Sequence, residues 1–402
     1  MPLSCCRPDV VPLDKILPDE PLLMMGAGPV PIPQAVAHAN SLVINHLGPT
    51  MARVIDQVKQ MARYVFQSSS PYMLGVAGPG SAAMEMAVCN LVSPGDTVLS
   101  VVNGYFSGRM AEMARRAGGN VVEQLVPAGL CAQPDDVERA LIAHHPKVLT
   151  IVQGETSNTT WNRMLPEICR VAAQHDCLVI VDTVCTLSTM PLEMDNWGVD
   201  AVITGGQKGL SSIPGVSLVA FSTRAFEHIN NREHAPVQWC LDAKLANGFW
   251  NESKYHYTAP TSGILALHEA LRLVCAETLE HRFERHLVCS EALQAGIEAL
   301  GLELLVAKPA RLNSVIGIKV PEGVNPDRVR QVMSDKHRVE IAGSFGLSIL
   351  RIGQMGEQSR AHNLFRTLDA LGSSMRECGA KVDVPHGMCE LARHLAQRSG
   401  AL

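Results

Sequence analysis

The sequence predicts an α/β protein whose large domain holds a mostly parallel sheet covered by helices on both faces. Short segments that are almost wholly apolar, such as 97–102 and 177–184, alternate with segments whose apolar residues recur at helical spacing. A strand that is apolar throughout needs cover on both faces, as in a parallel sheet between two layers of helices. A chain of 402 residues is also long enough for a second domain.

The elements follow one another in a regular order. Residues 1–20 contain prolines and no periodic pattern, so we predict an irregular N-terminal arm. Residues 21–285 form the predicted large domain, which begins with a short apolar run, a Gly/Pro loop and a helix over 49–67. Strands are then predicted at 72–78, 97–102, 121–126, 148–155, 177–184, 200–205 and 216–222. Helices are predicted at 80–92, 107–118, 134–145 and 166–176.

A long helical stretch over 262–300 ends this alternation, and we place a domain boundary inside it, near residue 285. A strand at 314–323, a helix at 325–337, a strand at 348–356 and a helix at 362–379 follow. Residues 286–402 are therefore predicted to form a smaller C-terminal α+β domain.

Composition excludes several classes of protein. The chain is 47% hydrophobic and 18% charged, with a net charge of −5 and no basic stripe, so neither nucleic-acid binding nor a membrane span is expected. The twelve cysteines form no CxxC motif and many lie in apolar segments, which favours reduced, buried thiols and no metal site. The N-terminal residues resemble no signal or transit peptide, so a cytoplasmic location is expected.

Two charged residues carry most of the functional information. Asp182 ends the apolar strand VIVD, and Lys208 lies 26 residues later in the glycine-rich GGQKG, close to one strand-to-strand step of an α/β sheet. An acid directly after a buried strand needs a cation as partner, and glycines around a lysine indicate close packing of the backbone. Pyridoxal phosphate (PLP) requires a lysine for its imine and a carboxylate for its pyridinium nitrogen. The pair therefore predicts PLP chemistry at an amino acid's Cα, although each residue alone could be a helix cap or a loop lysine.

Further candidates lie where other strands end. The glycine-rich turn before the helix at 80–92 could hold a phosphate on the backbone N–H groups of Gly80, Ser81 and Ala82, or be an ordinary tight turn. Phe106 could stack on a planar cofactor or belong to the core. Arg351 could grip a substrate carboxylate or lie at the surface of the small domain.

The segment Glu155–Asn158 offers hydroxyl, amide and carboxylate groups at the end of the strand predicted over 148–155. Such groups could bind a ring substituent of the cofactor, or they could form a polar turn that caps the next helix.

With these residues, the chain resembles the class V aminotransferases of PLP fold type I, and within them the alanine–glyoxylate/serine–pyruvate aminotransferase group. The resemblance covers nearly the whole chain. It is carried by the motifs GAGP (26–29), PGSAAME (79–85), NGYFSG (103–108), GETS (154–157), VDTV (181–184), GGQKG (205–209), KYHYT (254–258) and LRIG (350–353).

The resemblance implies a role for each matching residue. Lys208 resembles the Schiff-base lysine and Asp182 the partner of the pyridine nitrogen, while Arg351 resembles the substrate-carboxylate clamp and Gly28 the backbone beside the substrate. Cofactor contacts are implied for Gly80, Ser81, Ala82, Phe106, Thr156, Val184 and Gln207. Tyr255 and Thr258 resemble residues that reach the phosphate of a neighbouring subunit, so a homodimer with shared active sites is expected.

Some positions depart from the family pattern. Pro79 stands where a small polar residue is common, and the loop with Asn45 and His46 differs from the usual pocket loop, so His46 is a substrate-binding candidate. The C-terminal part resembles pyridoxamine–pyruvate aminotransferase, but Phe345 replaces its second arginine. Ureidoglycine–glyoxylate aminotransferases tend to lose the tyrosine present here as Tyr255.

The expected reaction is transamination between a small amino acid, alanine or serine, and glyoxylate or pyruvate. The alternatives are the pyridoxamine–pyruvate or ureidoglycine–glyoxylate reaction, a PLP lyase and a non-catalytic regulator on the same fold. A lyase such as a cysteine desulfurase needs a mobile loop cysteine, whereas Cys378 and Cys389 lie in or near predicted helices of the small domain, which disfavours it.

Overall fold

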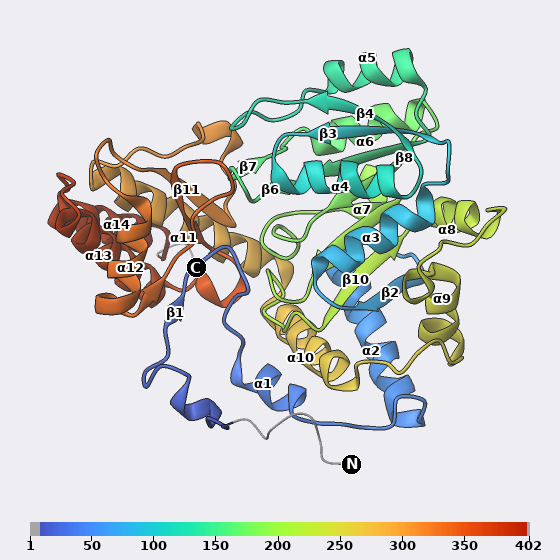
Figure 1. Cartoon of the computed structure of the whole chain (residues 1–402), viewed down its shortest axis with the longest axis horizontal. Helices are drawn as coiled ribbons and strands as arrows, with labels where there is room; N and C mark the ends of the chain where they lie inside the picture. Colours follow the sequence, from blue (N-terminus) through green and yellow to red (C-terminus); the bar gives the residue numbers. More distant parts are fainter. Residues whose placement is uncertain (1–8, 400–402) are drawn as a thin grey trace.

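The computed structural model describes residues 9–399, and Figure 1 shows two lobes joined by long helices. The larger lobe is built on a seven-stranded sheet of order β2-β10-β9-β8-β5-β3-β4. Its strands are β2 (Tyr72–Ala77), β3 (Thr97–Val102), β4 (Asn120–Leu125), β5 (Val148–Val152), β8 (Leu178–Asp182), β9 (Ala201–Gly205) and β10 (Val216–Phe221). Neighbours pair in parallel except at β10, which is antiparallel to both β2 and β9. The predicted mostly parallel sheet is therefore confirmed.

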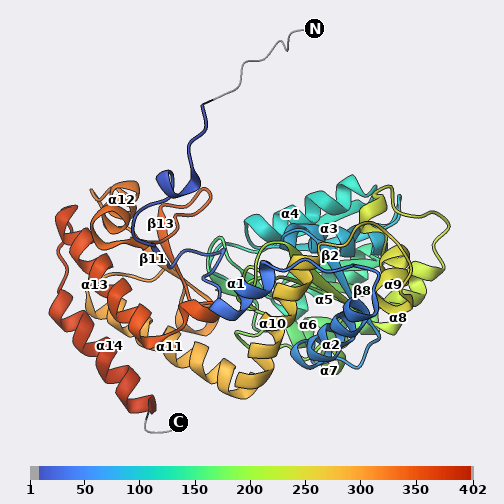
Figure 2. The same ribbon diagram turned by 90° about the horizontal axis from the view of Figure 1, so that it is seen from below.

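Helices cover both faces of this sheet. Figures 1 and 2 show α3 and α4 on one face and α5 and α6 on the other. Every residue of β5, β8, β9 and β10 is buried, which explains why these segments lack polar alternation. The helices of this lobe are α1 (Gln34–Asn40), α2 (Pro49–Phe66), α3 (Gly80–Leu91), α4 (Tyr105–Arg116), α5 (Pro134–His144), α6 (Leu165–Gln174), α7 (Met194–Trp197), α8 (Thr223–Asn230), α9 (Ala243–Glu252) and α10 (Thr261–Glu277).

Several short elements complete the larger lobe. The two-residue strands β6 (Gly154–Glu155) and β7 (Thr160–Trp161) pair after β5, and 3-10 turns lie at Leu13–Lys15 and Trp239–Leu241. Helices α1, α7, α8 and α9 have no counterpart among the sequence-based predictions, because each is short and lies in a segment without a long apolar period.

The smaller lobe contains α11 (Leu279–Ala299), β11 (Val315–Lys319), α12 (Pro326–His337), β12 (Val339–Glu340), β13 (Ile349–Gly353), α13 (Ala361–Glu377) and α14 (Val384–Ser399), with 3-10 turns at Lys308–Ala310 and Gly356–Gln358. The predicted strand–helix–strand–helix order is present. The short strand β1 (Leu23–Met24) pairs in parallel with β12. The helical stretch predicted over 262–300 is two helices, because Thr278 adopts φ 65° and its hydroxyl caps α11 at His281 N.

Two hydrophobic cores correspond to the two lobes. One contains residues from Met51 to Leu279, and the other contains Met25 together with residues from Cys289 to Leu391. The chain thus passes between cores within the first turns of α11, and the boundary proposed at residue 285 lies in that helix. Met25 packs in the C-terminal core, although the sequence placed the start of the large domain at residue 21.

The cysteines are not all buried. Five of the ten described thiols are buried, whereas Cys240 and Cys389 are exposed, and all ten are free. Cys5, Cys6 and the first part of the predicted arm lie outside the described residues. Among the described helices, none is long and apolar enough to cross a membrane. The described residues also contain no group of three or more His, Cys, Asp or Glu side chains suited to a metal ion.

Candidate active site

The carboxyl ends of β2, β3, β5, β8 and β9 meet at one edge of the sheet, where ligands of open α/β sheets bind. A cavity of about 140 Å³ opens there. Of the predicted site residues, those that line the cavity are Gly80, Ser81, Phe106, Thr156, Asp182, Val184, Gln207 and Lys208. Sequence reasoning missed four lining residues, which are Met84, Arg109, Gly154 and Cys185.

Asp182 is the last residue of β8 and is 5% exposed. Its Oδ1 accepts a hydrogen bond of 2.7 Å from Val184 N. Burial raises the pKa of Asp182 to about 7, although that hydrogen bond and the charges of Lys208 and Arg109 favour the ionised form. A cation bound in the cavity would therefore stabilise the ionised form of this buried carboxyl group.

Lys208 lies three residues after β9. The glycines on either side of it have no side chains, so its loop can pack closely against the rest of the protein. Its Nζ donates a hydrogen bond to the carbonyl oxygen of Ala27. Burial and the charge of Arg351 lower the pKa of Lys208, which increases the share of neutral, nucleophilic amine. A Cβ on Gly28 would lie 2.5 Å from Lys208 Nζ, and Gly28 has φ +99°, so only glycine fits at this position.

The opposite end of the cavity is formed by the N-terminus of α3. The backbone N–H groups of Gly80 and Ser81 begin this twelve-residue helix and lie at its positive end. Ala82 N instead donates to Pro79 O over 2.8 Å, so this predicted phosphate donor is engaged within the turn. Gln207 lines the same cavity, and its buried Oε1 has no partner among the described residues.

Phe106 is held in place by Glu155. It lies in the first turn of α4, because that helix begins at Tyr105 and not at the predicted residue 107. The carboxylate of Glu155 accepts hydrogen bonds from Phe106 N at 3.2 Å and Ser107 N at 2.9 Å. The fully buried Glu155 thus caps α4, an earlier helix, and not the next helix of the chain that the sequence offered as an alternative. Phe106, whose N–H takes part in this cap, lines the cavity.

Arg351, from β13 of the smaller lobe, reaches the same region. Its Nη1 donates to Thr156 O at 2.8 Å and its Nε to Gly343 O at 2.6 Å. Burial lowers the pKa of Arg351 to about 10, so the group stays charged at neutral pH. Nη2 makes no hydrogen bond to the described residues, which leaves one edge of the guanidinium for a carboxylate.

A stacked aromatic pair lies next to Phe106, whose ring centroid is 5.5 Å from that of Tyr105 and 6.3 Å from that of Phe345. Phe345 of the smaller lobe stacks on Tyr105 of α4, with ring centroids 4.4 Å apart, and Arg351 lies 5.7 Å from the Phe345 centroid. The pair therefore packs beside both Phe106 and Arg351.

Three predicted residues lie away from the cavity of their own chain. His46 packs edge-on against Tyr255, with ring centroids 5.9 Å apart, and its Nδ1 accepts from Ala259 N. Tyr255 is 63% exposed and Thr258 is also exposed. None of the three lines the cavity.

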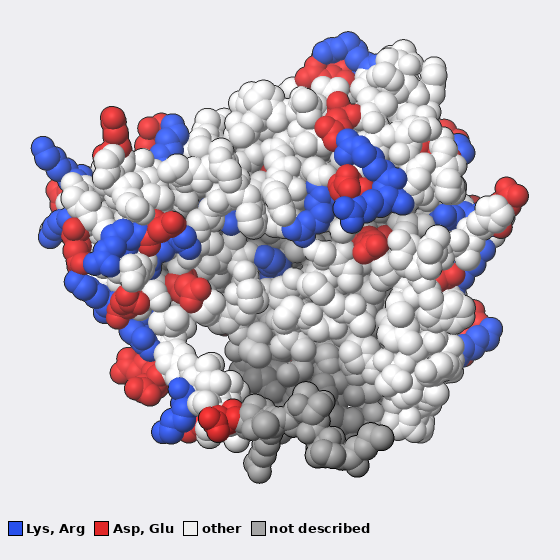
Figure 3. Space-filling model, in the orientation of Figure 1, with Lys and Arg blue, Asp and Glu red and all other residues white. Residues whose placement is uncertain are grey.

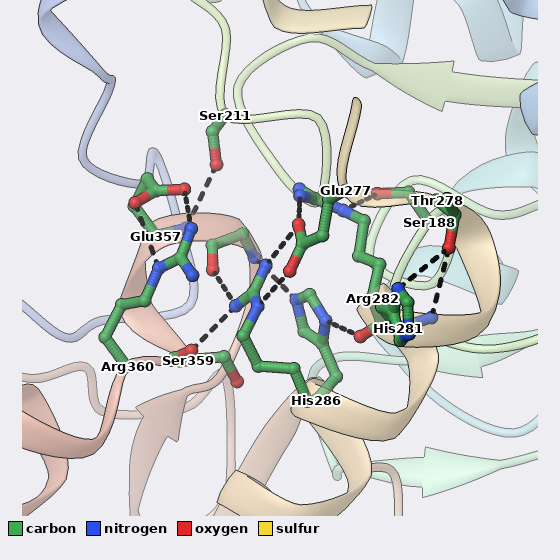
Figure 4. Close-up of polar contacts among 12 residues, drawn as sticks. Ser188, Ser211, Glu277, Thr278, His281, Arg282, His286, Glu357, Ser359 and Arg360 are labelled. Carbon is green, nitrogen blue, oxygen red and sulfur yellow. Dashed lines mark hydrogen bonds and ion pairs between the residues drawn. The ribbon is translucent and has the colours of Figure 1, made fainter. Parts of the chain in front are cut away.

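A partly buried polar cluster connects the Lys208 loop to the loop that follows Arg351 (Figure 4). Arg282 donates to the carbonyl oxygen of Gly209 at 2.5 Å, and Arg285 donates to those of Gly356 and Ser359. The carboxylate of Glu277 accepts from both arginines. Burial opposes ionisation of Glu277, but the two arginines outweigh it and lower its pKa to about 2.

His286 completes this cluster. Burial and the neighbouring arginines hold its pKa well below the usual range, so the ring is neutral. Its Nδ1 lies 2.7 Å from Arg282 O and must donate, which leaves Nε2 to accept from Gly356 N at 2.9 Å.

The comparisons with known proteins agree with this geometry. The family described as aminotransferase class-V matches residues 34–351, which is more than half of the chain. The chain belongs to the class-V aminotransferases. The family predicted from the sequence motifs is thereby confirmed, and the protein is a PLP-dependent aminotransferase.

Relatives of this aminotransferase carry related names. An alanine–glyoxylate aminotransferase of Drosophila melanogaster is 34% identical over 372 residues, which cover 90% of this chain and 94% of the relative. The crystal structure of a ureidoglycine–glyoxylate aminotransferase of Bacillus subtilis superposes with a TM-score of 0.91 at 28% identity, covering 94% of this chain and 99% of that one. A pyridoxamine–pyruvate aminotransferase of Mesorhizobium loti shares the fold, with a TM-score of 0.90 at 24% identity over 95% and 99% of the two chains.

The chemical groups of the cavity fit PLP, independently of the family match. Asp182 is a buried acid that lacks a bonded cation, Gln207 Oε1 is an unpartnered buried atom, and Lys208 offers a nucleophilic amine. Bound PLP would stack its ring against Phe106, place its pyridinium nitrogen at Asp182 and direct its phosphate to the start of α3.

Proposed function

We propose that this aminotransferase transfers an amino group between a small amino acid, alanine or serine, and a small 2-oxo acid, glyoxylate or pyruvate. The observation that carries the proposal is the meeting of Lys208 and Asp182 in one small cavity, next to Arg351. The alanine–glyoxylate aminotransferase that is 34% identical over most of the chain supports the choice of substrates.

Bound PLP supplies an electron sink for the electron pair that is left when a proton leaves the substrate's Cα. Asp182 keeps the ring nitrogen protonated, since its carboxylate is stabilised by that cation. Lys208 would hold the cofactor before the substrate binds, and its neutral amine would then move the proton from the substrate's Cα to C4′ of the cofactor. Arg351 orients the substrate by its carboxylate.

A substrate with a single carboxylate is favoured by the residues around Arg351. The Tyr105–Phe345 pair lies beside Arg351, whose guanidinium carbon is 5.7 Å from the Phe345 centroid. Phe345 also replaces the second arginine expected of the pyridoxamine–pyruvate group, so a single guanidinium from this segment serves a single carboxylate. The ureidoglycine–glyoxylate reaction remains the second candidate, on the likeness to the Bacillus subtilis enzyme.

A lyase that uses a cysteine as acceptor is disfavoured by the placement of thiols. Cys378 follows the last residue of α13 and Cys389 lies on α14, and neither lines the cavity. Cys185 is the cavity-lining thiol among the described residues, and burial raises its pKa to about 11. Such a thiol is protonated at neutral pH and is a poor nucleophile.

The substrates are tested by half-reactions. Purified holoenzyme is mixed with alanine, serine and a panel of larger amino acids, and the absorbance of the lysine-bound cofactor is followed. We expect rapid conversion to pyridoxamine phosphate with alanine or serine, and reversal on addition of glyoxylate or pyruvate. Conversion only by large amino acids, or only by an amine such as pyridoxamine, would contradict the proposal.

The role of Lys208 is tested separately with Lys208→Ala. This variant should bind PLP without the absorbance of a lysine-bound cofactor and lose turnover by several orders of magnitude, because cofactor exchange and proton transfer both need the amine. Wild-type turnover in this variant would contradict the assignment.

A homodimer with shared sites and a cytoplasmic location are proposed on sequence grounds. The dimer is supported by apolar side chains of the described arm that no core of this chain covers, such as Val10, Leu13 and Ile16 at 73%, 66% and 66% exposure. Figure 2 shows this arm running away from the body of the molecule. Tyr255 and Thr258 are exposed and resemble residues that contact the cofactor of a neighbouring subunit, which supports active sites shared between subunits.

A further inference from the structure

Arg109 is a cavity-lining cation to which neither the sequence motifs nor the reaction described above assigns a role. It lies on α4, one helical turn after Phe106, so the two side chains share a face of the helix. We propose that Arg109 binds the phosphate group of the cofactor, together with the N-terminus of α3. The inference rests on the proposed cofactor.

The first argument is the position of the guanidinium. Arg109 Nη1 donates a hydrogen bond of 2.7 Å to the hydroxyl oxygen of Ser81, the second residue of α3. The guanidinium and the free N–H groups of this helix therefore lie at the same end of the cavity. Because Ser81 Oγ accepts from Arg109, its own proton remains available to donate to an anion.

The second argument is charge. Arg115 and Arg116 of the same helix pair with Glu112 or Glu123, and Figure 3 shows basic and acidic side chains intermixed over α4. In contrast, Arg109 makes no ion pair with any carboxylate of the described residues. A helix N-terminus supplies only about half a positive charge, whereas a phosphate dianion carries about two negative ones, so the unpaired guanidinium supplies charge that the site needs.

The third argument is orientation. The guanidinium carbon of Arg109 lies 4.9 Å from the ring centroid of Phe106 and 5.2 Å from that of Tyr105. These rings cover the guanidinium by cation–π contact and leave its N–H edge for hydrogen bonds. Phe106 is also the ring expected under the cofactor, so a molecule stacked on Phe106 with an anionic arm matches both groups.

The test compares two ligands that differ only in the phosphate. Dissociation constants of PLP and of pyridoxal are measured by absorbance titration of the PLP-free protein, for wild type, Arg109→Gln and Arg109→Lys. Loss of a charge-assisted hydrogen bond should weaken PLP about 10- to 100-fold in Arg109→Gln, leave pyridoxal unchanged, and weaken PLP less in Arg109→Lys. Arg116→Gln, an exposed arginine of the same helix, is the matched control and should change neither constant.

The outcomes separate this inference from the proposed function. A wild-type protein that fails to bind PLP would contradict the proposed cofactor itself. If wild type binds PLP but Arg109→Gln weakens PLP and pyridoxal equally, Arg109 acts only by packing on the aromatic rings, and the inference is overturned. An unchanged PLP constant in Arg109→Gln, or a failure of both Arg109 variants to fold, overturns it as well.

Discussion

Asp182 shows how a single residue carries the chemistry of this protein. In the PLP-free protein its pKa is raised by burial from an ordinary value of 3.8 to about 7. The folded chain therefore binds the proton of Asp182 more tightly than the unfolded chain does. The stability that this protonation contributes is complete below about pH 4 and is lost as the pH rises through about 7. A pyridinium nitrogen beside the carboxylate reverses this preference, because it stabilises the ionised form.

This linkage predicts the behaviour of Asp182→Asn. Asparagine keeps the Oδ1 acceptor for Val184 N but does not titrate. In PLP-free protein, Asp182→Asn should gain free energy of unfolding relative to wild type between pH 5 and pH 8, by about 2.7 kcal/mol, because roughly two pK units of the shift lie between pH 5 and the folded-state pKa. Urea unfolding at the two pH values measures the difference. If the free energy of unfolding changed with pH in the same way in both proteins, Asp182 would not be a buried, titrating acid.

Arg351 predicts a separation between substrate and cofactor binding. In Arg351→Lys the charge remains but the planar fork is lost, so one hydrogen bond to the substrate carboxylate, about 1.5–3 kcal/mol, should disappear. We expect kcat/KM to fall about 10- to 100-fold while the absorbance of bound PLP is unchanged. Arg366→Lys is the matched control, since Arg366 is exposed and donates to carbonyl groups in the same lobe. Loss of PLP with retained affinity for the amino acid would assign Arg351 to the cofactor site instead.

At the scale of elements, the junction of α10 and α11 joins the two halves of the active site. Glu277 ends α10, and Arg282 and Arg285 lie in the first turns of α11. Their hydrogen bonds hold the carbonyl groups of the Lys208 loop and of the loop after β13. A direct contact adds to this junction, because Glu357 N donates to Ser211 Oγ at 3.1 Å. The position of Lys208 relative to Arg351 is therefore set by a cluster outside the cavity.

Glu277→Gln tests this junction. The change leaves the buried Arg282 and the partly buried Arg285 without their shared carboxylate, which should lower the free energy of unfolding by about 3 kcal/mol. Glu269→Gln, in the same helix, removes the partner of the half-exposed Arg272 and should cost less than about 1 kcal/mol. Urea unfolding of the holoenzyme provides the comparison. Equal losses in the two variants would show that Glu277 makes only an ordinary surface pair.

At the scale of the whole molecule, the exposed Tyr255 and the apolar arm predict a dimer with shared sites. Wild-type protein should sediment as a dimer at micromolar concentration. Subunits carrying Lys208→Ala and subunits carrying Tyr255→Ala are each expected to be impaired as homodimers. After subunit exchange, mixed dimers have one site with both defects and one intact site, so about a quarter of wild-type activity should return at random pairing.

The control for this experiment is a mixture of Lys208→Ala with wild-type subunits, in which no new intact site arises. A fully active monomer, or a mixture without recovered activity, would contradict sharing through Tyr255.

Local patterns in the sequence determined much of the fold. The strands and their mostly parallel arrangement were predictable, since a strand buried on both faces must be apolar along its whole length. The strand ends were predicted less well, because β5 and β8 end at Val152 and Asp182 and not at the predicted residues 155 and 184. Asp182 and Lys208 line one cavity. Helices α2, α5 and α6 were predictable from helical spacing, because each buries one face. Helix α3 was also predicted, although nine of its twelve residues are buried. The family was predictable because its motifs lie where strands end.

Only the tertiary structure decided which side chains share the cavity. In sequence, Arg109 resembles the solvated Arg115 and Arg116, and its position one turn after Phe106 acquires meaning only when α3 brings Ser81 beside it. Glu155 looks like a cofactor ligand until β5 and β3 become neighbours and place it under α4. Local patterns in the sequence indicate which face of a helix or strand is buried. Contacts between residues far apart in the chain depend instead on how the elements pack. That packing places Arg109 in the cavity and leaves Tyr255 outside it.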